Sequence, residues 1–191
     1  MCNLYRLTTT AQAIRDLFRA IEGEAPNLPP VAEHYPQRPA PVVVATHAGR
    51  ALARMTWGVP PPGATRPVTN VRNLASPFWR PLLAAPHRCL VPASAFAEWS
   101  ATPDPATGRK AKHWFALRSA PLFAFAGLFR QADGGPRFAI LTCEPNPTVA
   151  AVHPRAMPVL LTGALADRWL AGADAVAFQQ PWSDDDMIAL P

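Results

Sequence analysis

The chain has 191 residues, a formal net charge of +5 and 49% hydrophobic residues, including six Trp and nine Phe. This length fits one domain with its own core, and the aromatic content excludes a disordered chain. No stretch approaches the roughly 18 consecutive apolar residues of a membrane span. The charged N-terminal segment does not resemble a secretory signal, so we expect a cytoplasmic protein without membrane contact.

Cysteine spacing and short motifs exclude several kinds of chemistry. Cys2, Cys89 and Cys143 are far apart and form no C-x-x-C pair. We therefore expect no disulfide framework, no metal site and no cofactor. The sequence also has no G-x-S-x-G motif, no P-loop and no G-x-G-x-x-G motif, so esterase, nucleotide and dinucleotide chemistries lack support.

Charge is unevenly distributed along the chain. Between His34 and Pro103 there are seven arginines, no lysine and one acidic residue, Glu98, whereas three consecutive aspartates occur at residues 184–186. Such a distribution is typical of a surface that attracts nucleic acid. Scattered, solvated surface charge is the alternative, and composition leaves both interpretations open.

In chain order, the first predicted element is a helix that begins after the N-cap Thr10 and ends at Gly23, with apolar residues at the spacing of one helical face. An ordered, proline-rich wrap is expected over residues 27–41. Six β-strands are predicted at residues 42–46, 51–57, 88–93, 113–118, 122–129 and 137–142. Residues 133–136 read Asp-Gly-Gly-Pro, which predicts a hairpin turn between the last two strands.

The remaining elements are shorter. A helix is predicted at residues 147–152, a strand at 157–161, a helix at 164–170 and a C-terminal tail from about residue 181. Neither an internal repeat nor a composition break divides the chain. We therefore predict an α+β fold in which residues 1–191 form a single domain with a mainly antiparallel, curled, barrel-like sheet and short flanking helices.

Cys2 follows Met1 directly, so removal of Met1 would leave a free α-amine beside the thiol. Such an aminothiol can attack one aldehyde carbon twice, first forming a Schiff base and then a five-membered thiazolidine. A thiolate that attacks a carbonyl with the amine as its base, as in N-terminal nucleophile hydrolases, is a second interpretation. A cysteine that occurs there by coincidence is the third.

Three further polar residues are candidates for proton transfer or binding. Glu98 lies in an apolar segment that would raise its pKa, which suits a general acid or base, although an ion pair with an arginine is equally open. His153 titrates near neutral pH, or is a core histidine bonded to a carbonyl. Asn70, in Asn70-Val71-Arg72, offers an amide to a ligand or is a simple turn residue.

The order of these residues resembles that of the SRAP family, the SOS response-associated peptidases that shield abasic sites in single-stranded DNA. The segments that carry the resemblance over residues 1 to about 160 are Met1-Cys2, Trp57-Gly58-Val59-Pro60, Asn70-Val71-Arg72, Arg88-Cys89-Leu90-Val91-Pro92, Phe96-Ala97-Glu98-Trp99, Phe125-Ala126-Gly127-Leu128 and Val152-His153-Pro154-Arg155-Ala156-Met157-Pro158-Val159. Asn3 and Leu4 depart from the frequent Gly-Arg that follows Cys2, which affects DNA contacts more than chemistry.

The resemblance implies a DNA-damage enzyme in which Cys2 forms a thiazolidine with the opened sugar of an abasic site. It implies that Asn70 orients Cys2 and the sugar, Glu98 handles protons at the amine and the departing water, and His153 shuttles a proton to the ring oxygen. The expected partner is single-stranded DNA with abasic sites, bound by a monomer associated with the nucleoid. A thiol peptidase that acts on amides, including its own Met1, is the alternative.

Selectivity for DNA needs residues beyond these four. Arg54, Arg72 and Arg155 are the candidate phosphate ligands, which would give sequence-independent and salt-dependent binding. Trp57 and Trp79 are candidates for stacking on bases, with packing in the core as the alternative for both.

Overall fold

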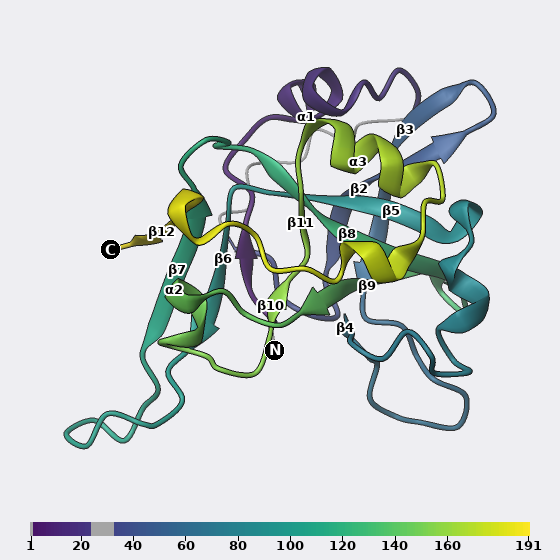
Figure 1. The fold of residues 1–191 in the computed structure, drawn as a ribbon. Helices are drawn as coiled ribbons and strands as arrows, with labels where there is room; N and C mark the ends of the chain where they lie inside the picture. The colour runs from purple at the N-terminus through teal and green to yellow at the C-terminus, as the bar shows by residue number, and fades with distance from the viewer. Residues whose placement is uncertain (1, 24–32) are drawn as a thin grey trace.

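The computed structural model describes residues 2–23 and 33–191 (Figure 1), and its centre is a closed ring of five strands. In ring order these are β9 (Gly135–Cys143), β3 (Gly49–Trp57), β2 (Pro39–Thr46), β5 (Arg88–Ala93) and β8 (Phe123–Ala132), and β8 pairs with β9 to close the ring. Five strands cannot alternate direction all the way round. The β3–β9 pair is accordingly parallel, and the other four pairs are antiparallel.

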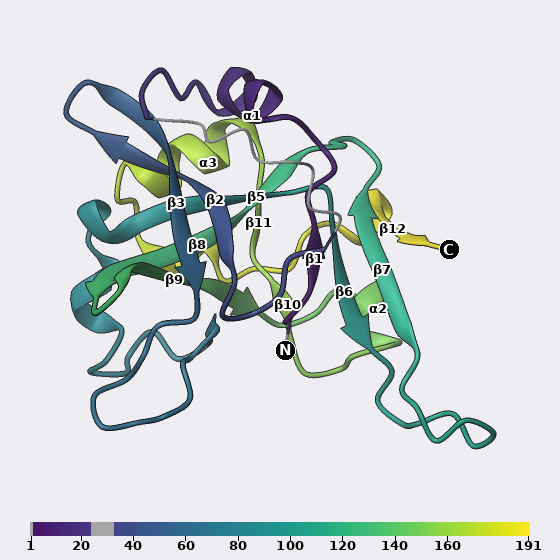
Figure 2. The same ribbon diagram turned by 180° about the vertical axis from the view of Figure 1, so that it is seen from behind.

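Short strands extend this barrel, and a second sheet lies beside it (Figure 2). The extensions are β4 (Asn70–Val71) and β10 (Met157–Pro158), both on β9, and β11 (Leu160–Leu161) on β8. The second sheet has the order β1 (Tyr5–Arg6), β6 (Ala95–Trp99), β7 (Lys112–Leu117) and β12 (Met187–Leu190). Its strand β12 lies within the segment that the sequence leaves as a C-terminal tail.

Helices are few and short. They are α1 (Ala11–Phe18), α2 (Pro147–Ala150) and α3 (Gly163–Leu170), with 3-10 turns at Arg80–Leu83, Ala85–His87, Ala175–Phe178 and Asp184–Asp186. Thr10 caps α1 as predicted, because its hydroxyl accepts a hydrogen bond from the Ala13 amide. The prediction that α1 continues to Gly23 is wrong, since Arg19 adopts a left-handed conformation (φ 53°) that ends the helix and leaves Ile21 73% exposed.

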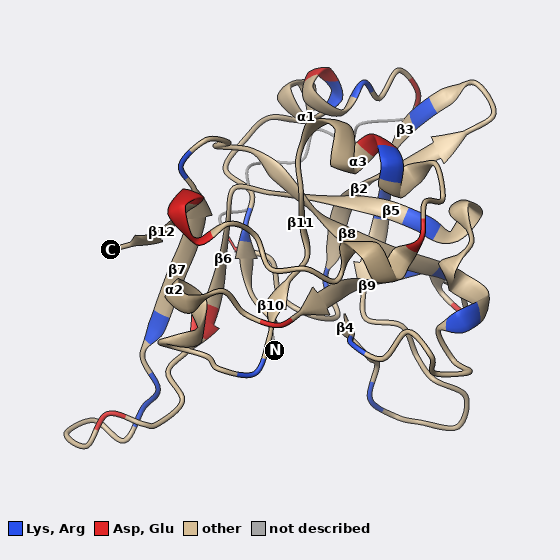
Figure 3. Cartoon of the chain, in the orientation of Figure 1, with Lys and Arg blue, Asp and Glu red and all other residues tan. Residues whose placement is uncertain are grey.

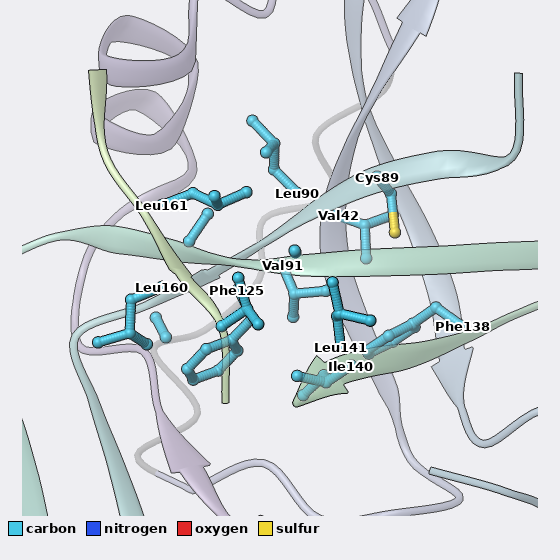
Figure 4. Close-up of a cluster of buried hydrophobic side chains, with 14 of the residues drawn as sticks. Val42, Cys89, Leu90, Val91, Phe125, Phe138, Ile140, Leu141, Leu160 and Leu161 are labelled. Carbon is cyan, nitrogen blue, oxygen red and sulfur yellow. The ribbon is translucent and has the colours of Figure 1, made fainter. Parts of the chain in front are cut away.

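The barrel interior forms the main core (Figure 4). Its walls are apolar, and Leu90, Phe125 and Ile140 are fully buried. Packing is close where β5 meets β8. A Cβ added at Gly127 would lie 2.6 Å from the Cys89 sulfur, so only glycine fits there without displacing a neighbour.

The predicted fold class is confirmed: this is an α+β single domain built on a mainly antiparallel, barrel-like sheet. Each of the six predicted strands overlaps an observed one, and the predicted hairpin joins β8 to β9. Part of the expected wrap at residues 27–41 lies outside the described residues, and its end forms β2. Within residues 2–23 and 33–191, none of the helices has the length and apolar character that crossing a membrane requires.

Candidate active site

Strand β1 places the start of the chain against β6, the strand that carries Glu98. Tyr5 pairs with Phe96, and the Ala97 amide donates to the Leu4 carbonyl oxygen at 2.9 Å. Cys2, just before β1, is only 1% exposed, and its thiol donates to the same Leu4 oxygen at 3.6 Å. Cys2 is therefore enclosed by the fold.

Asn70 holds Cys2 from the barrel side. Strand β4 pairs in parallel with β9, with Asn70 opposite Ile140, and this pairing presents the Asn70 side chain to the chain start. Its Nδ2 donates hydrogen bonds to the Cys2 carbonyl oxygen at 2.8 Å and to Thr69 Oγ1 at 3.0 Å. Its buried Oδ1 accepts no hydrogen bond from the described residues, so one acceptor is left for a ligand.

Glu98 and His153 form an acid–imidazole pair. Glu98 is 1% exposed on β6, and burial raises its pKa to about 7. His153 follows α2, and its Nδ1 lies 3.9 Å from Glu98 Oε2 and 3.1 Å from the Ala156 carbonyl oxygen. A carbonyl can only accept, so this contact assigns the proton to Nδ1 and leaves Nε2 as the basic nitrogen.

The local electrostatics keep the nucleophile protonated. Burial, reinforced by the charge of Glu98, raises the pKa of the Cys2 thiol well above its ordinary value. Burial also lowers the pKa of His153, so its ring is neutral at neutral pH. The site thus combines a neutral thiol, a neutral imidazole and a carboxyl group that titrates near pH 7, which suits proton transfer at neutral pH.

The candidate phosphate ligands differ in their surroundings. Arg72 forms an ion pair with Glu144, and its main-chain oxygen accepts a hydrogen bond from Gln179. Arg155 is exposed two residues after His153, and its charge contributes to the lowered pKa of that histidine. Arg54 is exposed on β3, and none of the contacts within the described part of the chain joins it to the four site residues.

Both tryptophans proposed for base stacking lie in the core. Trp57 is fully buried, and its indole nitrogen donates to the Thr69 carbonyl oxygen at 3.0 Å. Trp79 is 5% exposed and packs edge-on against Phe78. Neither ring has a free face for a base, because neighbouring side chains cover it. The core-packing alternative therefore replaces the stacking prediction for both residues.

Comparison with known proteins identifies the family. The family described as SOS response associated peptidase (SRAP) matches residues 1–191. This chain belongs to the SRAP family. Among curated relatives of this SRAP chain, the abasic site processing protein YoqW of Bacillus subtilis (strain 168) is 33% identical over a 157-residue alignment, and the match covers 72% of this chain and 67% of YoqW. The abasic site processing protein YobE of the same strain is 34% identical over 156 residues, covering 72% and 69%.

Solved structures share the SRAP fold. A protein from Bacteroides thetaiotaomicron superposes with a TM-score of 0.79 at 19% identity, over 98% of this chain and 90% of that chain. A protein from Bordetella bronchiseptica gives 0.76 at 23% identity, over 98% of both chains. At these identities the likeness establishes the fold alone.

Two features of the SRAP site have no signal in the sequence. Tyr5 is fully buried near the thiols of Cys2 and Cys89, burial raises its pKa well above the ordinary value, and its hydroxyl has no hydrogen-bond partner among the described residues. In the sequence Tyr5 looks like any apolar strand residue. Glu144 pairs with Arg72, which is 72 residues away in the sequence, and no local sequence pattern predicts a pair at that separation.

Metal-ligating side chains are dispersed over the fold. Across the described parts of the SRAP chain, no group of three or more His, Cys, Asp or Glu side chains is arranged to hold a metal ion. In the sequence, His87 and Cys89 are the nearest to a ligand pair, but Cys89 is fully buried in the barrel against Gly127. His87 instead packs against the ring of Phe129.

Proposed function

We propose that this chain processes abasic sites in single-stranded DNA by forming a covalent thiazolidine through Cys2, once Met1 has been removed. The names of the curated relatives, abasic site processing proteins, support the substrate. The observation that carries the proposal is the hydrogen bond from Asn70 to Cys2, made beside the Glu98–His153 pair. Glu98 and His153 would therefore transfer protons for the aminothiol of Cys2.

The reaction begins with the sugar. An abasic deoxyribose is mostly a closed hemiacetal, and opening it moves a proton from the anomeric hydroxyl to the ring oxygen. The basic Nε2 of His153 takes the first proton and delivers it to the ring oxygen, while Nδ1 stays bonded to the Ala156 carbonyl. The opened sugar then presents an aldehyde carbon to Cys2.

Ring formation follows in two additions. The α-amine of Cys2 adds to the aldehyde carbon, and loss of water from the carbinolamine gives the imine. The thiol sulfur then adds to the imine carbon and its proton passes to the nitrogen, so that aldehyde and aminothiol give thiazolidine and one water. Glu98, with a pKa of about 7, removes the ammonium proton and returns it to the departing hydroxyl.

The electrostatics favour attack by the amine first. Burial and the charge of Glu98 raise the pKa of the Cys2 thiol, so the thiolate is scarce near neutral pH. A free α-amine has a pKa near 7.7–8.0 and is partly neutral there. The thiol peptidase alternative depends on a thiolate as the first nucleophile, and no observation at the site favours it over imine formation.

DNA binding would position the lesion. Arg72 and Arg155 flank the site in sequence, and with Arg54 they would hold backbone phosphates of any sequence. We propose that the protein acts as a monomer on DNA in the cytoplasm, in association with the nucleoid.

A tag-removal experiment tests the proposal. The chain is produced behind a cleavable tag in place of Met1, so that protease treatment exposes Cys2 as the first residue. We expect a denaturation-resistant adduct with an abasic single-stranded oligonucleotide only after cleavage, and none with Cys2→Ala. Cys143→Ala, which removes another buried thiol, is the matched control and should still form the adduct. The absence of an adduct from cleaved wild-type protein, with Cys2 confirmed by mass spectrometry, would refute the proposal.

A further inference from the structure

Two arginines face one another directly across the β8–β9 hairpin. Arg130 and Arg137 are register partners in the antiparallel ladder, so their side chains leave the same face of the sheet. Like charges in opposite positions destabilise a strand pair. The hairpin would be more stable if one of them were neutral or acidic. Folding stability therefore does not explain why both positions are arginine.

The two guanidinium groups lack a direct acidic partner within the described residues. Neither arginine forms an ion pair there, although Asp133 lines the same hollow. The buried Nε of Arg137 has no hydrogen-bond partner among the described residues. Two guanidinium groups with open donors, directed into one hollow, form a receptor for an oxyanion such as phosphate.

The hollow has the size and walls of a nucleotide site. Arg130 and Arg137 line a cavity of about 600 Å³ together with the rigid proline run at residues 60–62. A second cavity of about 740 Å³ adjoins it, sharing Pro62, Arg130 and Gln131, and contains half-buried Phe78. The Arg130 guanidinium lies 6.0 Å from the centre of the Phe78 ring. Together we call these two cavities the hairpin groove.

The hairpin groove is connected to the active site by one strand. Arg137 lies on β9 three residues before Ile140, whose partner across the ladder is Asn70. Three residues of strand span about 10 Å. Measured along the axis of a DNA helix, one strand carries a phosphate about every 3.4 Å, so a few nucleotides bridge this interval. Figure 2 shows the hairpin, the loop after β3 and the two 3-10 turns at Arg80–Leu83 and Ala85–His87 at the same edge of the molecule.

We propose that the hairpin groove is a nucleotide subsite for the DNA strand that leads away from Cys2. Arg130 and Arg137 hold one backbone phosphate between them, and the adjoining base lies against Phe78. Charge complementarity favours this occupant. The groove offers two arginines without ion-pair partners beside an aromatic ring, and proteins that bind single-stranded nucleic acid combine positive charge and aromatic side chains in this way. This inference rests on the proposed function for its substrate, and it adds the place where the flanking strand binds.

Equilibrium binding tests the subsite separately from the covalent chemistry. The probe is a fluorescent single-stranded oligonucleotide without an abasic site, titrated at several salt concentrations. R130Q/R137Q is compared with R109Q/K110Q, which removes the same two charges from an exposed loop. We expect R130Q/R137Q to bind about tenfold more weakly, with a salt slope smaller by about 0.7 for each phosphate that the variant no longer neutralises. Phe78→Ala should lose at least about fivefold with an unchanged slope, and Phe78→Leu less.

Two results would overturn the subsite: R130Q/R137Q binding as tightly as wild type, or R109Q/K110Q losing as much affinity as R130Q/R137Q. Misfolding is excluded by thermal melting, because removing facing like charges should leave the melting temperature equal or higher. The covalent step is followed in parallel with an abasic oligonucleotide at saturating concentration. If wild type forms no adduct while R130Q/R137Q still loses binding, the subsite stands and the proposed function fails.

Discussion

The side-chain amide of Asn70 donates a 2.8 Å hydrogen bond to the main-chain oxygen of Cys2. This contact joins β4, on the barrel, to the residues that lead into β1, on the second sheet. The start of the chain is therefore held from two sides. In the proposed reaction, Cys2 held in this way loses little conformational freedom when the sugar binds.

Removing this hydrogen bond should slow the reaction without abolishing it. One neutral hydrogen bond contributes about 0.5–1.5 kcal/mol, so Asn70→Ala should lower the single-turnover rate of adduct formation by up to about tenfold. Asn70→Asp should be slower still, since an acceptor would face the Cys2 carbonyl oxygen. Asn73→Ala, which removes an asparagine from the next turn, is the control. Equal rates for wild type and Asn70→Ala would contradict this role.

Glu98 should make folding stability depend on pH. Burial raises its pKa from an ordinary 4.5 to about 7, so the folded chain binds the proton more tightly than the unfolded chain. Stability is then highest below about pH 4.5 and falls as pH rises towards 7, by up to about 3 kcal/mol. Glu98→Gln should remove this dependence, and denaturant unfolding from about pH 4 to 8 measures it. A wild-type stability that rises through this interval, relative to Glu98→Gln, would contradict the assignment.

We predict that Glu144 competes with DNA for Arg72. Both side chains of this ion pair are substantially exposed, 38% for Arg72 and 72% for Glu144, so the pair adds little to stability. Glu144→Gln should therefore leave the melting temperature nearly unchanged and tighten binding of a single-stranded oligonucleotide at low salt. Asp185→Asn removes one exposed acid from the acidic 3-10 turn that precedes β12 (Figure 3) and controls for net charge. The interpretation fails if both variants gain equally.

The Gly127 position should tolerate no larger side chain while Cys89 is present. A Cβ there would lie 2.6 Å from the Cys89 sulfur and 3.0 Å from a Val91 methyl group, so Gly127→Ala should cost about 1–3 kcal/mol of unfolding free energy. Adding Cys89→Ala should recover part of this cost. A double-mutant cycle from urea unfolding measures the coupling, and strict additivity would show that the clash is relieved elsewhere.

The sequence predicts the barrel strands well because they are buried and rich in β-formers. Strand β6 escapes prediction, since Ala95-Phe96-Ala97-Glu98-Trp99 contains two alanines and a glutamate, which are depleted in strands. It forms because β1 and β7 pair with it on both sides. The end of α1 is also not predicted. The apolar spacing continues to Ile21, but Arg19 adopts a left-handed conformation that ends the helix.

The members of the candidate site are proposed from the resemblance, whereas the contacts that hold them have no signal in the sequence. Resemblance names Cys2, Asn70, Glu98 and His153 together, and the structure places them together. What holds them is long-range, because the Asn70–Cys2 contact spans 68 residues and follows from strand pairings that no local pattern encodes. For the two tryptophans, the sequence suggests a role that the fold does not support. Aromatic residues in a basic region suggest stacking on bases, but burial of Trp57 is decided by the barrel around it.

The second sheet takes strands from both ends of the chain, in the order β1-β6-β7-β12. During synthesis, residues up to Cys143 suffice for the five ring strands, whereas β12 cannot join β7 until residues 187–190 have left the ribosome. The barrel can thus mature first while the sheet that carries Glu98 is still short of a strand. The proposed chemistry at Cys2 would then be acquired only after β12 has been synthesised.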